Sequence, residues 1–337
     1  MRDMSFIRAH LQNIEQNNLS KYAMLSTNSR GRLRDECESD TRTVYQRDKD
    51  RIIHSKAFRR LMNKTQVFLA PESDHYRTRL THTLEVAQIA RGISRALSLN
   101  EDLTEAIALG HDLGHTPFGH AGEAVLDSIC PIGFKHYQQS GRIVDILEND
   151  HRGLNLTFEV RDGIVNHTTG VLPQTLEGCV VRLSDRIAYI NHDIDDATRG
   201  GIIEENDIPD DIKRELGNTG SERINTMIRS TVDASWDSDR IVMHKNVQEA
   251  TSKLHDFMFE RVYTDPVAKG EEGKAKQLIA ELYNYYLKYP QSLPPEYYSQ
   301  LETEDPCIVV CDYIAGMTDR YAIQRYTGIF LPKTWQG

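Results

Sequence analysis

The 337-residue sequence predicts an all-α protein, and three kinds of observation support this fold class. Apolar residues recur every three or four positions in several long segments, as they do on the buried face of a helix. Residues typical of helix starts and ends flank these segments. Long runs in which apolar and polar residues alternate, the pattern of a half-buried strand, do not occur.

The first two predicted helices follow each other closely in the chain. One covers residues 81–97 and carries a single apolar stripe. The stripe consists of Val86, Ile89, Ala90, Ile93 and Leu97. The next helix begins after Asn100, a typical N-cap residue followed by two acidic residues that complement the helix dipole. It ends near His111, and Gly114 is a natural stop.

Further helices are predicted along the rest of the chain. Pro117 is expected to open a short helix through the small residues Ala121, Gly122 and Ala124. A long helix over 176–197 carries a second apolar stripe. This stripe consists of Leu183, Ile187, Ile190 and Ile194. The stretch 264–273 has the composition of a loop, and the helix that follows it should end at Pro290.

Composition narrows the class of protein. With 39% apolar and 27% charged residues, the chain reads as a soluble globular protein. No apolar run approaches the roughly 20 residues that span a membrane, and the charged segment 1–18 does not resemble a signal peptide. Five cysteines without a Cys-x-x-Cys pair favour a cytoplasmic location over a disulfide scaffold. The formal charge of −10 disfavours general nucleic-acid binding.

One basic stretch departs from this acidic balance. Seven basic side chains lie between residues 47 and 64. They are Arg47, Lys49, Arg51, Lys56, Arg59, Arg60 and Lys64. Such a concentration indicates an anionic ligand, most simply phosphate. The alternative is a solvent-exposed helix face in which Asp48 and Asp50 pair with neighbouring bases.

Histidines and acidic residues concentrate after the second predicted helix. His111 and Asp112 are followed by His115, His120 and Glu123 within 13 positions. Imidazole and carboxylate together suit a divalent first-row metal that keeps a position open for water. Burying so many polar groups without a purpose would be costly. We therefore predict a metal site here.

The dipeptide His-Asp occurs twice more, so it carries no meaning without its context. His192-Asp193 lies in the predicted helix over 176–197. His255-Asp256 lies among apolar residues with no other ligand-type residue near it, and we interpret it as structural.

Two other predicted helices offer residues that could complete the site. His82 lies on the apolar stripe of the helix over 81–97, where a histidine is either a buried core residue or a ligand. Asp185, Tyr189 and Asp193 follow each other at four-residue spacing and share one face of the long helix. They could meet a polar ligand, or they could be exposed residues opposite the apolar stripe.

Several segments resemble the bacterial dGTPase-like deoxynucleotide triphosphohydrolases of the HD-domain superfamily. The order His82, His111-Asp112, Asp185 is similar to the metal-binding signature of HD-domain phosphohydrolases. The longer matches are the segments 47–68, 75–83, 111–123, 155–164, 182–189 and 312–319. The resemblance covers about residues 20 to 200 strongly and returns near the end with the last of these segments.

The resemblance implies an all-α HD-domain fold that cleaves a dNTP into deoxynucleoside and inorganic triphosphate. We expect an N-terminal arm over 1–45, a catalytic core over 46–200 and a C-terminal helical region over 201–337 packed on the core. The implied cofactor is a divalent cation, with Mg, Mn, Fe, Co and Zn all compatible with the ligand types. The implied ligands are His82, His111, Asp112 and Asp185.

The resemblance also assigns roles around the substrate. Gln66 and Asp193 would bind the 3′-hydroxyl, and Tyr189 would pack where a 2′-hydroxyl would sit. The phosphate-facing residues would be Arg79, Arg186, His115 and His136. His120 and Glu123 would form the proton-transfer pair, since residues three apart meet on one helical turn. A protonated His120 oriented by Glu123 would suit the leaving 5′-oxygen, and activation of water by the same pair is the alternative.

Other functions and partners remain open at this point. The chain could be another HD-domain phosphohydrolase that acts on a deoxynucleoside monophosphate or on a cyclic or alarmone nucleotide. It could also be a non-catalytic nucleotide sensor, or a single-stranded nucleic-acid binder that uses the basic stretch. The resemblance further implies a homo-oligomer (tetramer or hexamer) and a dNTP as allosteric effector, with no membrane partner.

Overall fold

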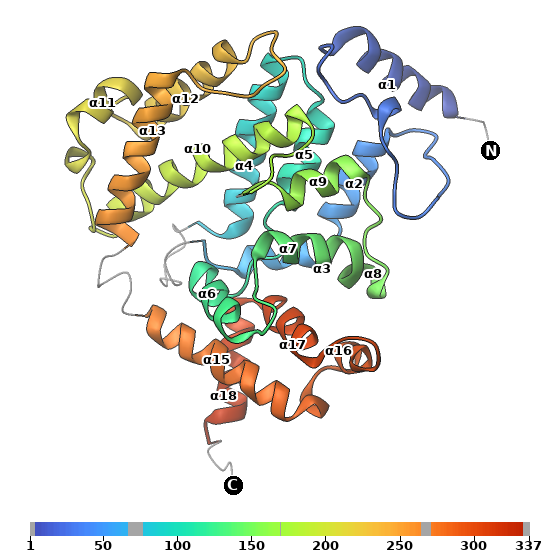
Figure 1. Ribbon diagram of the computed structural model, residues 1–337, viewed down its shortest axis with the longest axis vertical. Helices are drawn as coiled ribbons and strands as arrows, with labels where there is room; N and C mark the ends of the chain where they lie inside the picture. Colours follow the sequence, from blue (N-terminus) through green and yellow to red (C-terminus); the bar gives the residue numbers. More distant parts are fainter. Residues whose placement is uncertain (1–3, 67–76, 169, 264–270, 333–337) are drawn as a thin grey trace.

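The computed structural model describes residues 4–66, 77–168, 170–263 and 271–332, and these ranges are helical (Figure 1). They contain no β-strand, only the isolated bridges Arg32–Thr157 and Thr65–Thr78. The predicted all-α fold class is therefore confirmed. None of the described helices combines the length and the apolarity needed to cross a membrane.

The described helices fall into an N-terminal and a C-terminal set. The N-terminal ones are α1 (Ser5–Asn18), α2 (Val44–Ile53), α3 (Lys56–Arg60), α4 (Arg79–Ala96), α5 (Glu101–Gly110), α6 (Gly119–Ile129), α7 (His136–Arg142), α8 (Glu148–His151) and α9 (Phe158–Val165). The C-terminal ones are α10 (Leu176–Arg199), α11 (Asp210–Leu216), α12 (Gly220–Ala234), α13 (Lys245–Met258), α15 (Glu272–Lys288), α16 (Pro295–Tyr298), α17 (Pro306–Ala315) and α18 (Asp319–Phe330). Two π-helical turns, Ile143–Leu147 and Phe259–Tyr263, extend α7 and α13.

Buried apolar side chains form two separate clusters. The first cluster joins α2, α4, α5, α9, α10 and the helices α11 to α13. The second cluster contains side chains of the four helices α6, α15, α17 and α18. In Figure 1 the helices α15 to α18 gather at the lower end of the molecule, with α6 and α7 between them and α4, α5 and α10. The segment that carries most of the predicted site thus lies between two hydrophobic clusters.

The predicted helices are largely confirmed. The helix over 81–97 is α4, which begins two residues earlier behind a Thr78 cap, and the helix over 176–197 is α10. Asn100 caps α5, because its side chain accepts a hydrogen bond from the Leu103 backbone N–H at 3.2 Å. Both apolar stripes are turned to the first cluster.

Two predicted boundaries need correction. Pro117 does not open α6: Phe118 and Gly119 follow it with positive φ angles of 62° and 54°, and the helix begins at Gly119. Most of the predicted loop over 264–273 lies outside the described residues, but Glu272 and Gly273 already belong to α15. That helix ends before Pro290, as the sequence predicts.

Gly114 allows the close approach on which the site depends. A Cβ atom at this position would lie 2.2 Å from the His136 carbonyl oxygen and 2.2 Å from the Ser140 backbone nitrogen. Only glycine therefore lets α7 pack directly on the turn that follows α5. This packing brings His136 beside His115.

Candidate active site

Three helices bring the four predicted ligands to one point. His82 comes from α4, His111 and Asp112 follow α5, and Asp185 comes from α10. His82 Nε2 lies 3.1 Å from Asp185 Oδ1 and 3.9 Å from Asp112 Oδ2. His111 Nε2 lies 3.4 Å from Asp112 Oδ1 and 3.7 Å from Asp185 Oδ1. We call these four side chains the ligand corner.

The hydrogen bonds of His111 leave one ring nitrogen directed at the ligand corner. His111 Nδ1 lies 2.7 Å from the Ala108 carbonyl oxygen, so this nitrogen carries the proton and donates. Nε2 is then a lone-pair donor, and it is buried without a hydrogen-bond partner in the described part of the chain. A backbone carbonyl that fixes a histidine tautomer in this way is typical of metal sites. The donor set therefore fits a divalent cation.

The charges in the ligand corner favour ionised carboxylates. Burial by itself would raise the pKa of Asp185, but the adjacent His82 and His111 lower that pKa to about 2. Burial is likewise outweighed for Asp112, whose pKa is held well below its ordinary value by neighbours that include His111 and Arg79. Arg79 Nη1 donates to Asp112 Oδ2 at 2.8 Å. Both carboxylates are thus available to a cation at neutral pH.

A second group of side chains, which we call the acid–base wall, lies next to the ligand corner. It consists of His115, His120, Glu123 and His136. The His115 and His136 rings are stacked with centroids 4.0 Å apart, and His115 Nε2 lies 3.1 Å from Asp112 Oδ1. Glu123 accepts hydrogen bonds from His136 Nδ1 and from the His136 backbone N–H, both at 3.0 Å.

Glu123 lies near a second histidine, His136, as well as near its predicted partner His120. His120 Nδ1 lies 3.7 Å from Glu123 Oε2, and 77% of the His120 side chain is exposed. The primary partner of Glu123 is therefore His136, which lies 13 positions along the chain, and His120 is its looser second partner. Burial would raise the pKa of Glu123, but His120 and His136 outweigh burial and hold that pKa far below its ordinary value.

Sequence reasoning missed His167, which connects the two groups. The His167 ring centroid lies 5.0 Å from that of His111, and its Nε2 atom lies 3.3 Å from His136 Nε2. Its Nδ1 atom donates to the Ile164 carbonyl oxygen at 2.6 Å. Burial first, and then the nearby His111 and His136, lower the pKa of His167 to about 3. The residue follows a matched segment but has no ligand-type neighbours in sequence, so no local pattern marked it.

A cavity of about 490 Å³ opens onto both groups. The predicted site residues that line it are Gln66, Arg79, His82, Asp112, His115, His120, His136, Asp185, Tyr189 and Asp193. Gln66 Oε1 is buried and makes no hydrogen bond within the described ranges. The row Asp185, Tyr189, Asp193 thus faces the cavity rather than solvent, and His82 is both buried and on the cavity wall.

Two predicted phosphate-binding arginines have protein partners instead of open space. Arg79 lines the cavity but is buried against Asp112. Arg186 is not among the described residues that line the cavity, and its Nη2 atom lies 3.3 Å from Ser252 Oγ on α13. Arg186 would have to leave this contact to reach a ligand.

The far side of the cavity holds residues that the sequence did not indicate. His255, Phe259 and Val262 line it from the end of α13, and Thr168 lines it from the segment after α9. The structural interpretation of His255 stays a prediction, and its side chain lies on the cavity wall beside the Tyr189 ring, with centroids 6.2 Å apart. The apolar neighbours in its own sequence hid this position.

The basic stretch does not act as one surface. Three of its bases pair with carboxylates of the protein. Arg47 lies 3.1 Å from Glu36, Arg51 lies 2.7 Å from Glu36, and Lys49 lies 3.1 Å from both Asp102 and Glu105. Asp48 and Asp50 pair with Arg32 and Arg42, outside the stretch.

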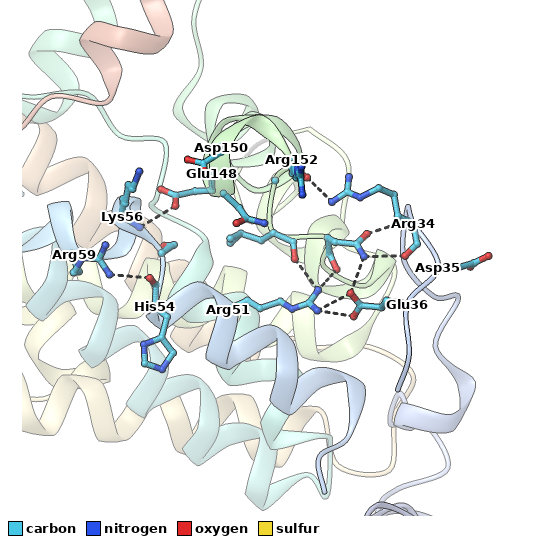
Figure 2. A pocket seen from close by; sticks show the side chains of 15 residues that line it. Arg34, Asp35, Glu36, Arg51, His54, Lys56, Arg59, Glu148, Asp150 and Arg152 are labelled. Carbon is cyan, nitrogen blue, oxygen red and sulfur yellow. Dashed lines mark hydrogen bonds and ion pairs between the residues drawn. The ribbon is translucent and has the colours of Figure 1, made fainter. Parts of the chain in front are cut away.

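An open pocket lies beside the remaining part of this stretch. Figure 2 shows Lys56 and Arg59 on one side of the pocket and the Arg51–Glu36 pair on the other. Arg34 and Arg152 also line it, and so do the acidic residues Asp35, Glu36, Glu148 and Asp150. The bases of this pocket thus stand among carboxylates, and the anionic ligand expected for the basic stretch stays a prediction.

The HD domain family matches residues 79–190, and a phosphohydrolase-associated domain matches residues 241–328. A deoxyguanosinetriphosphate triphosphohydrolase-like protein of Caldanaerobacter subterraneus is 56% identical over 329 residues, which cover 98% of this chain and 97% of that protein. A protein of the same description from Desulfatibacillum aliphaticivorans is 47% identical and covers 97% of this chain and 98% of its own length.

A solved structure shares the fold at low sequence identity. The crystal structure of a phosphohydrolase from Bacteroides thetaiotaomicron superposes with a TM-score of 0.54 at 17% identity. The superposition covers 83% of this chain and 68% of that one.

Proposed function

Because the chain belongs to the dGTPase-like family of HD-domain phosphohydrolases, we propose that it hydrolyses deoxynucleoside triphosphates to deoxynucleoside and inorganic triphosphate with a bound divalent cation. The observation that carries this proposal is the meeting of His82, His111, Asp112 and Asp185 within about 4 Å beside a cavity lined by a separate acid–base wall. A nucleotide sensor would need the cavity but not the acid–base wall.

The four side chains of the ligand corner would hold the cation. A divalent cation at this position supplies Lewis-acid polarisation of a phosphoryl oxygen and lowers the pKa of water. His111 offers its Nε2 lone pair because the Ala108 carbonyl holds the proton on Nδ1. Arg79 pairs with Oδ2 of Asp112, which keeps this carboxylate ionised and in place.

Both ring nitrogens of His136 lie within hydrogen-bond distance of a partner. Nδ1 lies 3.0 Å from Glu123 Oε1, and Nε2 lies 3.3 Å from His167 Nε2. The ring is also stacked on that of His115. Held in this position on the cavity wall, His136 would bind an oxygen of the α-phosphate.

His120 is the exposed member of the acid–base wall and the one free to exchange protons with solvent. We propose that it protonates the leaving 5′-oxygen while Glu123 orients both histidines. Activation of water by His120 uses the same contacts and stays the alternative. On the opposite wall, Tyr189 would pack against the sugar, and Gln66 and Asp193 would bind its 3′-hydroxyl.

A panel of substrates and metals tests this proposal. The purified chain is incubated with each dNTP and with Mg, Mn, Fe, Co or Zn, with and without a second dNTP, and the products are identified by phosphorus NMR. Intact inorganic triphosphate is the expected product. Release of single phosphate or pyrophosphate would indicate another HD-domain chemistry. Salt-sensitive oligonucleotide binding without turnover would indicate a nucleic-acid binder.

A dNTP effector and a homo-oligomer stay predictions that the same panel examines. Stimulation of turnover by a second, non-hydrolysed dNTP would support the effector. Measuring the molecular mass with and without that dNTP would show whether binding and assembly are linked.

A further inference from the structure

The segment 312–319, at the end of α17 and the start of α18, matches the family but has no role in the chemistry described above. It belongs to the second hydrophobic cluster, which includes Tyr313, Ile314 and Met317. Its two aspartates are nevertheless turned toward the active site rather than toward solvent, and both are buried. Their partners are the elements that carry the acid–base wall.

Asp319 holds two of these elements with one carboxylate. Its Oδ1 atom accepts from the Phe118 backbone N–H at 2.9 Å. Its Oδ2 atom accepts from the Thr65 backbone N–H at 3.0 Å and also from the Thr65 hydroxyl. Phe118 adopts a left-handed conformation two residues before His120, and Thr65 directly precedes Gln66. Asp319 thus fixes the entry to α6 and the approach of Gln66 from behind the cavity.

Lys64 connects the same segment to the turn that carries His115. Only 2% of Lys64 is exposed, and its Nζ atom donates to the His115 carbonyl oxygen and, at 2.8 Å, to the Ala315 carbonyl oxygen. Lys64 is therefore not available to an anionic ligand, although its sequence context suggested one. A buried ammonium needs such acceptors, so both carbonyl groups are held near it.

Asp312 holds the third element, α7. Its Oδ1 and Oδ2 atoms accept from Arg142 Nε at 2.9 and 2.8 Å, and Oδ1 also accepts from Gln139 Nε2 at 2.8 Å. Arg142 and Gln139 lie on the helix that His136 begins. The segment 312–319 thus contacts, through buried polar groups, the carriers of His115, His120 and His136.

We propose that Lys64, Asp312 and Asp319 are positioning residues that hold the acid–base wall in register with the ligand corner, so that the C-terminal helices set the rate of proton transfer. The inference rests on the proposed function. The cavity-lining residues of the described ranges include none of the three, so they act through the groups that they hold. A misplacement of about 1 Å in a catalytic group can cost about 100-fold in rate, and the hydrogen bonds of buried charged groups are the contacts most costly to leave unmade.

The test compares Asp319→Ala and Asp319→Asn with the control Asp305→Asn. Asp305 is also an aspartate at the start of a helix in this region, where it accepts from the Cys307 backbone N–H at 2.7 Å, but it is exposed. We expect Asp319→Ala to lower kcat by about 10- to 100-fold while KM and metal content stay within about threefold. Asp319→Asn keeps one acceptor oxygen, so its kcat should lie between those of the wild type and Asp319→Ala. The kcat of the control Asp305→Asn should equal that of the wild type.

A double-mutant comparison separates positioning from a general loss of stability. On a Glu123→Gln background, Asp319→Ala should cost less than about threefold further in kcat, because the group that it positions is already disabled. A full additional 10- to 100-fold loss would overturn the proposal, as would an unchanged kcat in the single variant. Lys64→Met provides a second single variant with the same expectation.

Amide hydrogen exchange keeps this inference distinct from the proposed function, since it needs no substrate. In Asp319→Ala the Phe118 and Thr65 amides lose their acceptor and should exchange about 10-fold faster or more, together with the first turn of α6. If the wild type releases no triphosphate from any dNTP, the proposed function fails. The positioning role is then decided by exchange: faster exchange over 115–123 supports it, and unchanged exchange overturns it.

Discussion

The ligand corner and the acid–base wall touch each other but rest on different parts of the molecule. His82, His111, Asp112 and Asp185 come from α4, α5 and α10, whose apolar stripes belong to the first hydrophobic cluster. The acid–base wall comes from the 115–118 turn, α6 and α7, and α6 packs on the C-terminal helices of the second cluster. One active site is thus supported by two cores.

One member of the acid–base wall differs from the ligand corner in its access to solvent. His111 and Asp112 are buried, and Arg79 compensates the charge of Asp112. His120 is mostly exposed at the cavity. A site that must hold a cation benefits from rigidity, whereas a group that exchanges protons needs contact with water. The difference indicates that metal retention and proton transfer can be disabled separately.

The largest effect is expected from the ligand corner. Asp112→Ala removes a carboxylate and leaves Arg79 buried without its partner. Because partners that only support metal ligands are each worth about 10- to 100-fold in affinity, we expect loss of the metal and of all measurable turnover. Metal content by elemental analysis and triphosphate release check this. Asp127→Ala, which alters an aspartate on α6 away from the ligand corner, is the control. Full activity with bound metal in Asp112→Ala would remove this residue from the site.

The acid–base wall should fail in a different way. Glu123→Gln keeps the shape of the side chain but removes the charge that holds His136 and His120. General acid–base groups contribute about 10²- to 10⁴-fold, so we expect a loss of kcat in that range with wild-type metal content. Loss of metal together with turnover would contradict the separation of the two groups.

A matched pair of core substitutions tests whether each cluster supports its own group. Ile93 in the first cluster and Ile314 in the second are both fully buried. Replacing either by alanine should lower the free energy of unfolding by about 2–5 kcal/mol, measured by urea denaturation. Below the unfolding transition, we expect a lower kcat with normal metal content only for Ile314→Ala. Equal kinetic effects from both variants would mean that the site responds to stability alone.

The same contrast explains what the sequence could and could not predict. The ligand corner lies on helices with clear apolar stripes, so periodicity placed His82 on the buried stripe of α4, but it left open whether the Asp185 face of α10 meets a ligand or solvent. The family resemblance then supplied their roles. The helix boundaries that failed, such as Pro117, lie where backbone turns with positive φ decide the path.

The contacts of the acid–base wall depend on tertiary packing that no local pattern encodes. Glu123 meets His136 because Gly114 lets α7 approach the preceding turn. Asp319 reaches Thr65 across 254 positions of the chain. His255 lies on the cavity wall at the end of α13, a position that its apolar neighbours in sequence did not indicate. Periodicity assigns a face to each side chain but does not say which distant element covers that face.

Stability at low pH should report on the Glu123 contacts specifically. The pKa of Glu123 is lower in the folded chain than its ordinary value of 4.5. Its ionised form therefore stabilises the fold above that value, and this contribution is lost as the pH falls below it. We expect wild type to exceed Glu123→Gln in unfolding free energy by about 1–3 kcal/mol at pH 7, with a smaller difference at pH 4. A difference independent of pH would exclude this charge effect.

The smallest effect on catalysis is expected from Tyr189, which belongs to neither the ligand corner nor the acid–base wall. Tyr189 shares α10 with Asp185, but its ring faces the cavity next to His255. Tyr189→Ala should open space at the 2′ position and lower the dNTP-to-NTP ratio of kcat/KM by about 10-fold, the scale on which a pocket resolves one small group. Metal content should stay normal, and Tyr189→Phe, which keeps the ring, should retain the ratio. An unchanged ratio of kcat/KM in Tyr189→Ala would mean that other residues select the sugar. A loss of metal in this variant would mean that Tyr189 also supports the metal-binding residue Asp185 on the same helix.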